Sequence, residues 1–161
     1  MGQIVIKEVS WDDPDAVTLR AAMSQEMDER YRDRMSGYGE QRAAVLEALS
    51  VSDDTVVYVA VAYTPDGDPV GHAALRRHGA DIELKRMYVT PGQRGRGVSQ
   101  ALLVAAEDAA RALGADRLVL QTGDRQPDAI TLYERAGYAR IPVFPPYEVL
   151  DQSICMARDL R

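Results

Sequence analysis

A loop rich in glycine and arginine, set between a strand-like segment and a helix-like segment, constrains the fold of this chain most strongly. Residues 82–89 have the composition of a β-strand. Residues 90–98 contain a proline and three glycines, which is typical of a loop. Residues 99–113 are rich in Ala and Leu and are followed by Gly114, as at the C-terminal end of a helix. The chain therefore contains a strand, a tight loop and a long helix in direct succession.

The other segments predict further strands and helices, folded as a single domain over residues 1–161. Apolar periodicity, β-branched runs and turn residues mark these elements. In chain order they are a strand at 4–9, helices at 14–31 and 40–49 with a break at 36–39, strands at 56–63 and 70–77, a strand at 117–122, a helix at 128–135, and strands at 138–141 and 153–158. Turn residues join strands 56–63, 70–77 and 82–89 into an antiparallel meander.

Composition and charge narrow the class of protein. With 161 residues and 46% hydrophobic content, the chain can bury one core without disulfides or metal. Its net charge of −6 argues against a nucleic-acid partner, which would require a basic face. Residues 1–4 lack the features of a signal peptide, and no apolar run has membrane-spanning length. We expect a soluble, cytoplasmic protein without a membrane partner, and the near absence of lysine hints at a bacterial source.

Cysteine and histidine give no sign of a metal site. Cys155 is the one cysteine and lies in an apolar run, so we expect it in the core. His72 and His78 have no spacing with Cys or carboxylates that is typical of a metal site. Both are interpreted as surface or hydrogen-bonded histidines.

The loop before the long helix has the chemistry of an anion site. The first N–H groups of a helix lack internal partners, and the helix dipole is positive there. Gly95 and Gly97 would let a phosphate approach the backbone, while Arg94 and Arg96 add charged donors. A plain solvated turn remains the alternative. A Walker loop is excluded because the loop has no lysine, and a dinucleotide fingerprint because Gln100 replaces its third glycine.

At these residues the chain resembles the GCN5-related N-acetyltransferases (GNAT). That family carries Gln or Arg, two residues, Gly, one residue, and Gly or Ala, which is Arg94-Gly95-Arg96-Gly97-Val98-Ser99 here. Ser99 departs from the pattern but is small and able to cap the helix. The likeness extends to 83–89 before the loop, 101–103 after it and 129–138 near the end, about the second half of the chain.

The resemblance implies a fold and a cosubstrate. The fold is α/β, with a mixed, mostly antiparallel sheet of six to seven strands, about four flanking helices and one splayed strand pair. Acetyl-CoA would lie in that gap, with its diphosphate on residues 94–99 and its pantetheine on main-chain groups of Met87, Tyr88 and Val89. Gln126 stands where many members place an asparagine that contacts the cosubstrate, although Pro127 follows it. No metal is implied.

The resemblance also implies two catalytic residues. Glu83 occupies the strand position of a family glutamate that accepts the amine proton directly or through water. The alternative is a Glu83 that faces solvent or pairs with Lys85 or Arg86. Tyr133 matches a family tyrosine that protonates the departing thiolate, and its alternative role is packing with a tethered hydroxyl.

The implied reaction is acetyl transfer from acetyl-CoA to a primary amine by direct attack in a ternary complex. A non-catalytic acyl-CoA-binding or sensing domain is the main rival, and a nucleotide-binding module is a third hypothesis. The acceptor, a small molecule or a peptide amine, is not identified, and the oligomeric state stays open with a homodimer among the alternatives. Candidate acceptor-binding residues are Trp11, Asp28, Glu29, Tyr31, Asp33, Tyr38 and the loop 144–147.

Overall fold

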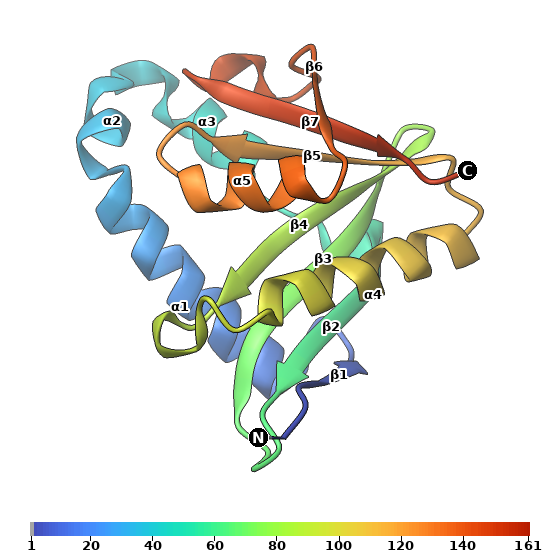
Figure 1. Ribbon diagram of the computed structural model, residues 1–161. Helices are drawn as coiled ribbons and strands as arrows, with labels where there is room; N and C mark the ends of the chain where they lie inside the picture. The colour runs from blue at the N-terminus through green and yellow to red at the C-terminus, as the bar shows by residue number, and fades with distance from the viewer. Residues whose placement is uncertain (1) are drawn as a thin grey trace.

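A computed structural model describes residues 2–161 as a seven-stranded mixed sheet with helices on both faces (Figure 1). The strand order is β1-β2-β3-β4-β5-β7-β6. The strands are β1 Val5–Glu8, β2 Val56–Tyr63, β3 Pro69–His78, β4 Asp81–Val89, β5 Arg117–Gly123, β6 Ala139–Ile141 and β7 Ser153–Asp159. The α-helices are α1 Pro14–Arg30, α2 Arg32–Gly37, α3 Arg42–Leu49, α4 Val98–Ala112 and α5 Pro127–Arg135. The expected mixed, mostly antiparallel sheet is confirmed.

The contact between β4 and β5 is the one parallel pairing in this sheet, and it is short. Its register covers three pairs, from Ile82 opposite Leu118 to Leu84 opposite Leu120. Beyond these pairs the two strands diverge toward their C-terminal ends (Figure 1). The neighbouring antiparallel pairs are longer, since β5 and β7 pair along seven positions. A gap thus opens between these two strands in the middle of the sheet.

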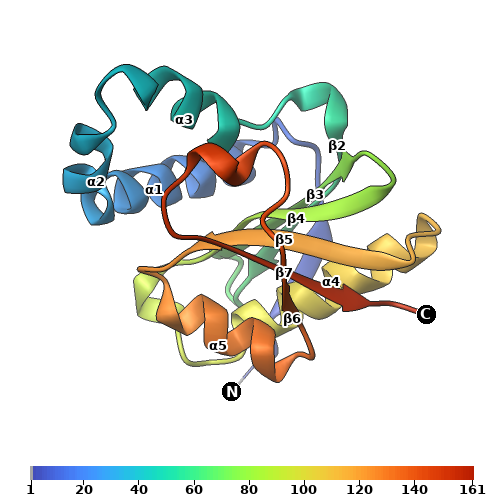
Figure 2. The same cartoon turned by 90° about the horizontal axis from the view of Figure 1, so that it is seen from above.

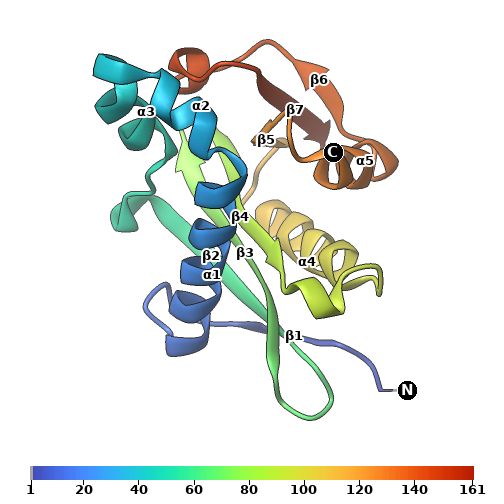
Figure 3. The ribbon, with the colours of Figure 1, turned by 90° about the vertical axis from the view of Figure 1, so that its left-hand side faces the viewer.

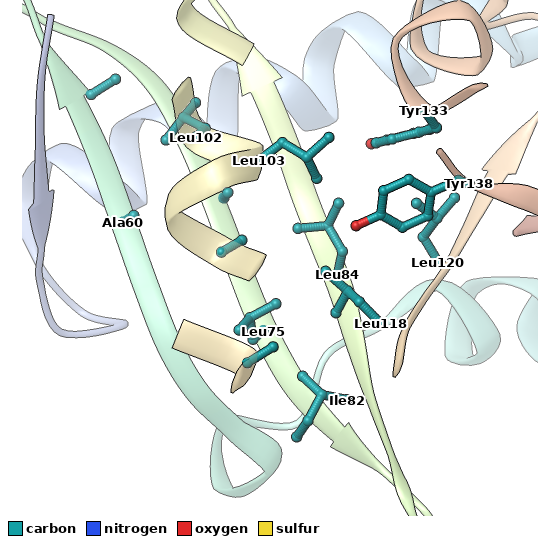
Figure 4. Close-up of a cluster of buried hydrophobic side chains, with 14 of the residues drawn as sticks. Ala60, Leu75, Ile82, Leu84, Leu102, Leu103, Leu118, Leu120, Tyr133 and Tyr138 are labelled. Carbon is teal, nitrogen blue, oxygen red and sulfur yellow. The ribbon is translucent and has the colours of Figure 1, made fainter. Parts of the chain in front are cut away.

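Helices α1 and α4 cover opposite faces of β2–β4 (Figure 3). Successive residues of a strand point to opposite faces. On β2, Ala60 and Ala62 therefore belong to the core under α4, while Val59 and Val61 pack with α1. Leu102 and Leu103 of α4 lie over this first core (Figure 4). The small strand residues let α4 approach the sheet closely.

Two local expectations were wrong. The expected single break at 36–39 is one of two breaks: α1 ends before Tyr31, and an unpredicted helix, α2, occupies Arg32–Gly37 and ends within the expected break. The side chain of Tyr31 is held from outside the helices, by the backbone N–H of Arg125, which donates to its hydroxyl over 3.2 Å. Ser99 does not cap α4, since Gly97 is the N-cap residue and no side chain caps the helix. Cys155 is buried as expected.

Candidate active site

A cavity of about 380 Å³ occupies the gap between the diverging ends of β4 and β5. Helices α1, α2, α3 and α5 supply its other walls. From the central strands come Leu84, Lys85, Arg86, Met87, Leu120, Gln121, Thr122 and Gly123. A space of this size between two strands is well within the range of ligand sites. The cavity is therefore the natural place to test the residues expected from the sequence.

The loop before α4 exposes backbone donors. Gly95 and Gly97 have φ values of 76° and 82°, in the left-handed region that favours glycine. A Cβ added at either position would meet no atom within 4 Å, so there is open space beside the backbone. Because no side chain caps α4, the N–H groups of its first turn remain available to an anion. Val98 is buried and anchors the end of the loop.

The side chain of Arg94 is already engaged within the protein. Its Nε donates to the carbonyl oxygen of Val89 over 2.9 Å, and its Nη2 donates to both carboxylate oxygens of Glu26 over 2.9 and 3.0 Å. These bonds tie the loop to α1, which lies beside it in Figure 1. Arg96 is exposed. The two arginines therefore differ: Arg94 fixes the loop, and Arg96 is the more accessible charge.

A β-bulge in β4 determines where the next residues lie. Arg86 has a φ of 57°, and the pairing with β3 shifts between His72 and Ala74. Arginine can only donate, so Arg20 Nη1, 3.0 Å from His72 Nε2, makes that nitrogen an acceptor. His72 Nδ1 therefore carries the hydrogen and donates to the carbonyl oxygen of Arg86 over 2.9 Å. Burial lowers the pKa of His72 to about 4, which keeps this tautomer neutral.

The three residues expected to bind pantetheine follow the bulge. Met87 lines the cavity, whereas the side chains of Tyr88 and Val89 are buried in the two cores. They lie on the part of β4 that β5 no longer pairs with. Their main chain, rather than their side chains, is thus what this strand presents to the gap.

Tyr133 and Gln126 both reach the cavity from the segment after β5. Tyr133 lies in α5, is 5% exposed, and packs against Tyr138 with 5.7 Å between ring centroids (Figure 4). Burial raises the pKa of the Tyr133 hydroxyl, so it stays protonated at neutral pH. Gln126 precedes α5, and its Nε2 donates to the hydroxyl of Tyr31 over 3.5 Å. Both residues line the cavity, and their roles stay predictions.

Glu83 lies behind the cavity rather than in its wall. It is completely buried, and its carboxylate accepts from Arg76 Nε over 2.8 Å and from the Tyr147 hydroxyl over 2.5 Å. Its ion-pair partner is therefore Arg76, not Lys85 or Arg86 as in the alternative considered above. Tyr147 belongs to a short 3-10 helix, η4 Tyr147–Val149, which packs on α3 (Figure 2).

Sequence reasoning missed the buried group that surrounds Glu83. Arg76 is directly opposite Glu83 across the β3–β4 ladder, and Lys85 donates to the hydroxyl of Tyr147 over 2.8 Å. Of this group, Lys85 lines the cavity. The sequence did carry a signal for this group, because charged residues stand inside two otherwise apolar strands. A charged side chain is buried only where it has partners, so these residues could have been expected to pair with one another.

The remaining candidates for acceptor binding divide into two sets. Asp28, Tyr31 and Tyr38 line the cavity, together with Met23, Met27 and Met35. Trp11 instead stacks on the guanidinium of Arg20, 3.5 Å from the ring centroid. Asp33 does not line the cavity, and its carboxylate accepts from Arg125 Nη1 over 2.7 Å. Glu29 and residues 144–146 also lie outside the cavity wall.

Residues 2–161 lack a membrane-spanning helix and a cluster of metal-binding side chains. No helix there combines the length and apolar character needed to cross a membrane. In the same range, no three side chains of His, Cys, Asp or Glu gather into a group able to hold a metal ion.

Comparison with known proteins gives the family. Residues 19–138 match the model of the Acetyltransferase (GNAT) family. The chain therefore belongs to this family. Over 90 residues it is 39% identical to an IAA acetyltransferase of Azospirillum brasilense, a match that covers 56% of this chain and 59% of that relative. The chain spans about half the length of the curated relatives it matches, since two further matches cover 43% and 46% of theirs.

Solved structures agree over the whole chain. A Klebsiella pneumoniae protein assigned as an acyl-CoA N-acyltransferase has a TM-score of 0.76 and 28% identity, with 99% of each chain covered. PaiA N-acetyltransferase from Thermoplasma acidophilum, solved in complex with coenzyme A, has a TM-score of 0.69 and 16% identity, with 98% of this chain and 99% of that chain covered. The second likeness concerns the fold alone.

Proposed function

We propose that this protein is an acetyl-CoA-dependent N-acetyltransferase that acetylates a primary amine by direct attack in a ternary complex. One observation carries the proposal: the cavity opens where β4 and β5 lose their pairing. In the same chain, a glycine loop leads into α4, whose N-terminus no side chain caps. Membership of the GNAT family and the coenzyme A bound by the Thermoplasma neighbour support the choice of donor. The acceptor is a small-molecule or peptide amine.

The cosubstrate would be held mainly by backbone groups. Amides of Gly95, Gly97, Val98 and Ser99 fit a diphosphate, because the helix dipole and unpaired N–H groups favour negative charge there. The accessible guanidinium of Arg96 would add to this attraction, with Arg94 holding the loop against α1. The free edge of β4 at Met87–Val89 would bind pantetheine. An N–H group on this edge would stabilise the developing oxyanion, and loss of one such donor costs about 10²–10³ in rate.

The protein groups would manage two protons. The acceptor must lose one before or during attack, and the departing thiolate must gain one. The protonated hydroxyl of Tyr133 in the cavity wall would supply the second. Glu83 would act in the first transfer only indirectly, because its carboxylate is fully buried behind Arg76 and Tyr147.

The test is a panel of amines with acetyl-CoA, followed by release of free thiol. The panel should include small alkyl amines, amino acids, an aminoglycoside and a peptide with a free N-terminus. Amine-dependent thiol release is the expected result. Binding of CoA without turnover of any amine would instead indicate a sensing domain, and failure to bind CoA at all would refute both.

A further inference from the structure

Lys85 is the buried lysine of the cavity wall. It is 6% exposed and follows Leu84, the last β4 residue paired with β5. Two positions earlier on the same strand, Glu83 points to the same side but has no opening to the cavity. A proton that moves from an acceptor amine in the cavity to Glu83 must therefore travel by way of another side chain.

The hydrogen bonds around Tyr147 define that group. The Tyr147 hydroxyl donates its one hydrogen to Glu83 and accepts from Lys85 Nζ over 2.8 Å and from Arg76 Nη2 over 3.0 Å. The oxygen thereby uses its donor and both acceptor sites. Lys85 Nζ, in contrast, has this single acceptor among residues 2–161, whereas an ammonium group carries three donors. The geometry suits a neutral amine, because an ammonium group here would have one hydrogen-bond acceptor and the Tyr147 ring, 5.1 Å from Nζ to the centroid, as its partners among residues 2–161.

A count of buried charges leads to the same result. Arg76, Lys85 and Arg86 surround one carboxylate, that of Glu83, which already pairs with Arg76. Arg86 is fixed elsewhere, since its Nη2 donates to the carbonyl oxygen of Leu49 over 2.8 Å. A protonated Lys85 would add a charge without a counterion of its own. Burial lowers the pKa of Lys85 to about 7; the attraction of Glu83 opposes this shift, and the repulsion of Arg86 and Arg76 adds to it.

The other titratable groups that line the cavity with Lys85, or lie beside Glu83, come from each element around the cavity. They are Asp28 on α1, Tyr31 between α1 and α2, Arg34 on α2, Tyr38 before α3, Tyr133 on α5, Asp151 after η4, and Cys155 on β7 beside Glu83. Arg34 is neutralised by Asp124 at 2.5 Å. The two carboxylates, Asp28 and Asp151, are exposed, so solvent screens their effect on Lys85.

We propose that Lys85 is the general base that takes the proton from the acceptor amine, with Tyr147 and Glu83 as positioning residues; this rests on the proposed acetyl transfer. The neutral Nζ accepts one hydrogen as the amine nitrogen forms its bond to the acetyl carbon. The carbon–sulfur bond then breaks, the thiolate takes a proton from Tyr133, and Lys85 returns its proton to Tyr133 through solvent. The products are the amide and the free thiol.

The chain offers a direct measurement, because its two lysines are Lys7 and Lys85. Protein labelled with ¹³C-lysine gives two Cε signals, which are followed from pH 5 to pH 10 by NMR. Lys7 is exposed on β1, and Lys7→Arg assigns the signals while leaving the cavity intact. We expect the Lys85 signal to titrate around pH 7. A Lys85 signal that stays in the ammonium form up to pH 9 would overturn the proposal, whether or not an acceptor is known.

Kinetics of Lys85→Arg provide the second test. Arginine keeps the hydrogen-bond donors, stays in the charged form at all pH values tested and does not accept a proton. We expect kcat/KM to fall by roughly 10²-fold or more, and the acidic limb of the pH profile near pH 7 to disappear. The pH profile of kcat/KM is measured with the least basic amine that the wild type acetylates. The pKa of this substrate then lies below the acidic limb, so its own deprotonation does not contribute to that limb. Lys7→Arg is the matched control and should behave as wild type.

A Tyr147→Phe variant separates positioning from structure. Without the hydroxyl, Lys85 loses the acceptor that stabilises its ammonium form, so the acidic limb should move to lower pH; an unmoved limb would refute the role of Tyr147. If Lys85→Arg keeps the wild-type rate and profile in an active enzyme, Lys85 is not the base, while the acetyltransferase proposal stands. An acetyl group found on Lys85 during turnover would make it a nucleophile instead. Absence of all amine turnover would remove both proposals.

Discussion

Tyr133 and Tyr138 are neighbouring buried tyrosines whose hydroxyls have different surroundings. Tyr138 donates to the buried carboxylate of Glu107 over 2.8 Å, whereas Tyr133 forms part of the cavity wall. We expect Tyr133→Phe to lower kcat by about 10²-fold with little change in CoA affinity, because general acids contribute this much. Tyr138→Phe, the matched control, should keep kcat but lose about 1–3 kcal/mol of stability, since Glu107 loses a donor. Steady-state kinetics and urea unfolding check the pair, and equal kcat values would contradict the assignment.

His72 gives the protein a defined acid sensitivity. Its pKa falls from an ordinary value of 6.5 to about 4 through burial, so the unfolded chain binds its proton first as the pH drops. The stability that depends on neutral His72 is thus complete above about pH 6.5 and is lost between there and pH 4, by up to about 3 kcal/mol.

The comparison variant is His72→Asn, whose amide can still donate to the carbonyl oxygen of Arg86 but does not titrate. Urea unfolding at several pH values should show a smaller loss between pH 6.5 and pH 4 than in the wild type. A pH dependence identical in both proteins would mean that His72 is not the source.

Residue identities revealed the cavity-facing Tyr133 but not the position of Glu83. A strand pattern predicts that Glu83 lies on one face, yet the partner that takes its carboxylate depends on the register with β3, which places Arg76 opposite. Tyr147 comes from a loop with no recognisable motif, so its approach to Glu83 depends on tertiary packing alone. Long-range polar networks of this kind are therefore visible only in the folded protein.

At the scale of elements, a side chain at Gly97 should strain the loop before α4. With φ at 82°, alanine would be strained even though its Cβ meets no atom within 4 Å. We expect Gly97→Ala to cost about 1–2 kcal/mol, which appears as lower stability or as CoA affinity weakened about tenfold. Calorimetric titration with CoA and thermal unfolding distinguish these outcomes. Gly92→Ala, in the same loop at ordinary φ and with open space around it, is the control and should change neither.

The elements themselves were largely predictable, because local pattern decides most of them. Strand β2 was expected at 56–63 and is found there, since a run of β-branched and aromatic residues is bounded by turns. The α1–α2 boundary was not predictable in this way. At this break Tyr31 contacts residues far along the chain: the N–H of Arg125 donates to its hydroxyl, and a Cβ added to Gly123, at the end of β5, would meet that hydroxyl at 2.1 Å.

On the scale of the whole molecule, two parts of the sheet meet at the short β4–β5 ladder. Helices α1 and α4 pack mainly on strands β1–β4, whereas α5 lies beside β5 and β7 (Figure 2). Beyond the three paired positions, ion pairs between α2 and the β5–α5 loop bridge the cavity: Arg34 with Asp124 and Asp33 with Arg125. One arginine comes from each side, since Arg34 lies on α2 and Arg125 in the β5–α5 loop. Exposed pairs of this kind contribute little individually.

A ligand that contacts both parts should therefore couple them. If CoA lies between β4 and β5, it stabilises the folded chain by about 2.7 kcal/mol at 100 times its Kd. We expect bound CoA to raise the Tm and to slow amide hydrogen exchange at Met87–Val89 and Gln121–Gly123. These ends of β4 and β5 do not pair with each other, so their facing backbone groups are open to the ligand. Exchange in β2, which is hydrogen-bonded on both sides to β1 and β3, serves as the internal reference. Protection confined to the loop before α4 would place the ligand outside the gap.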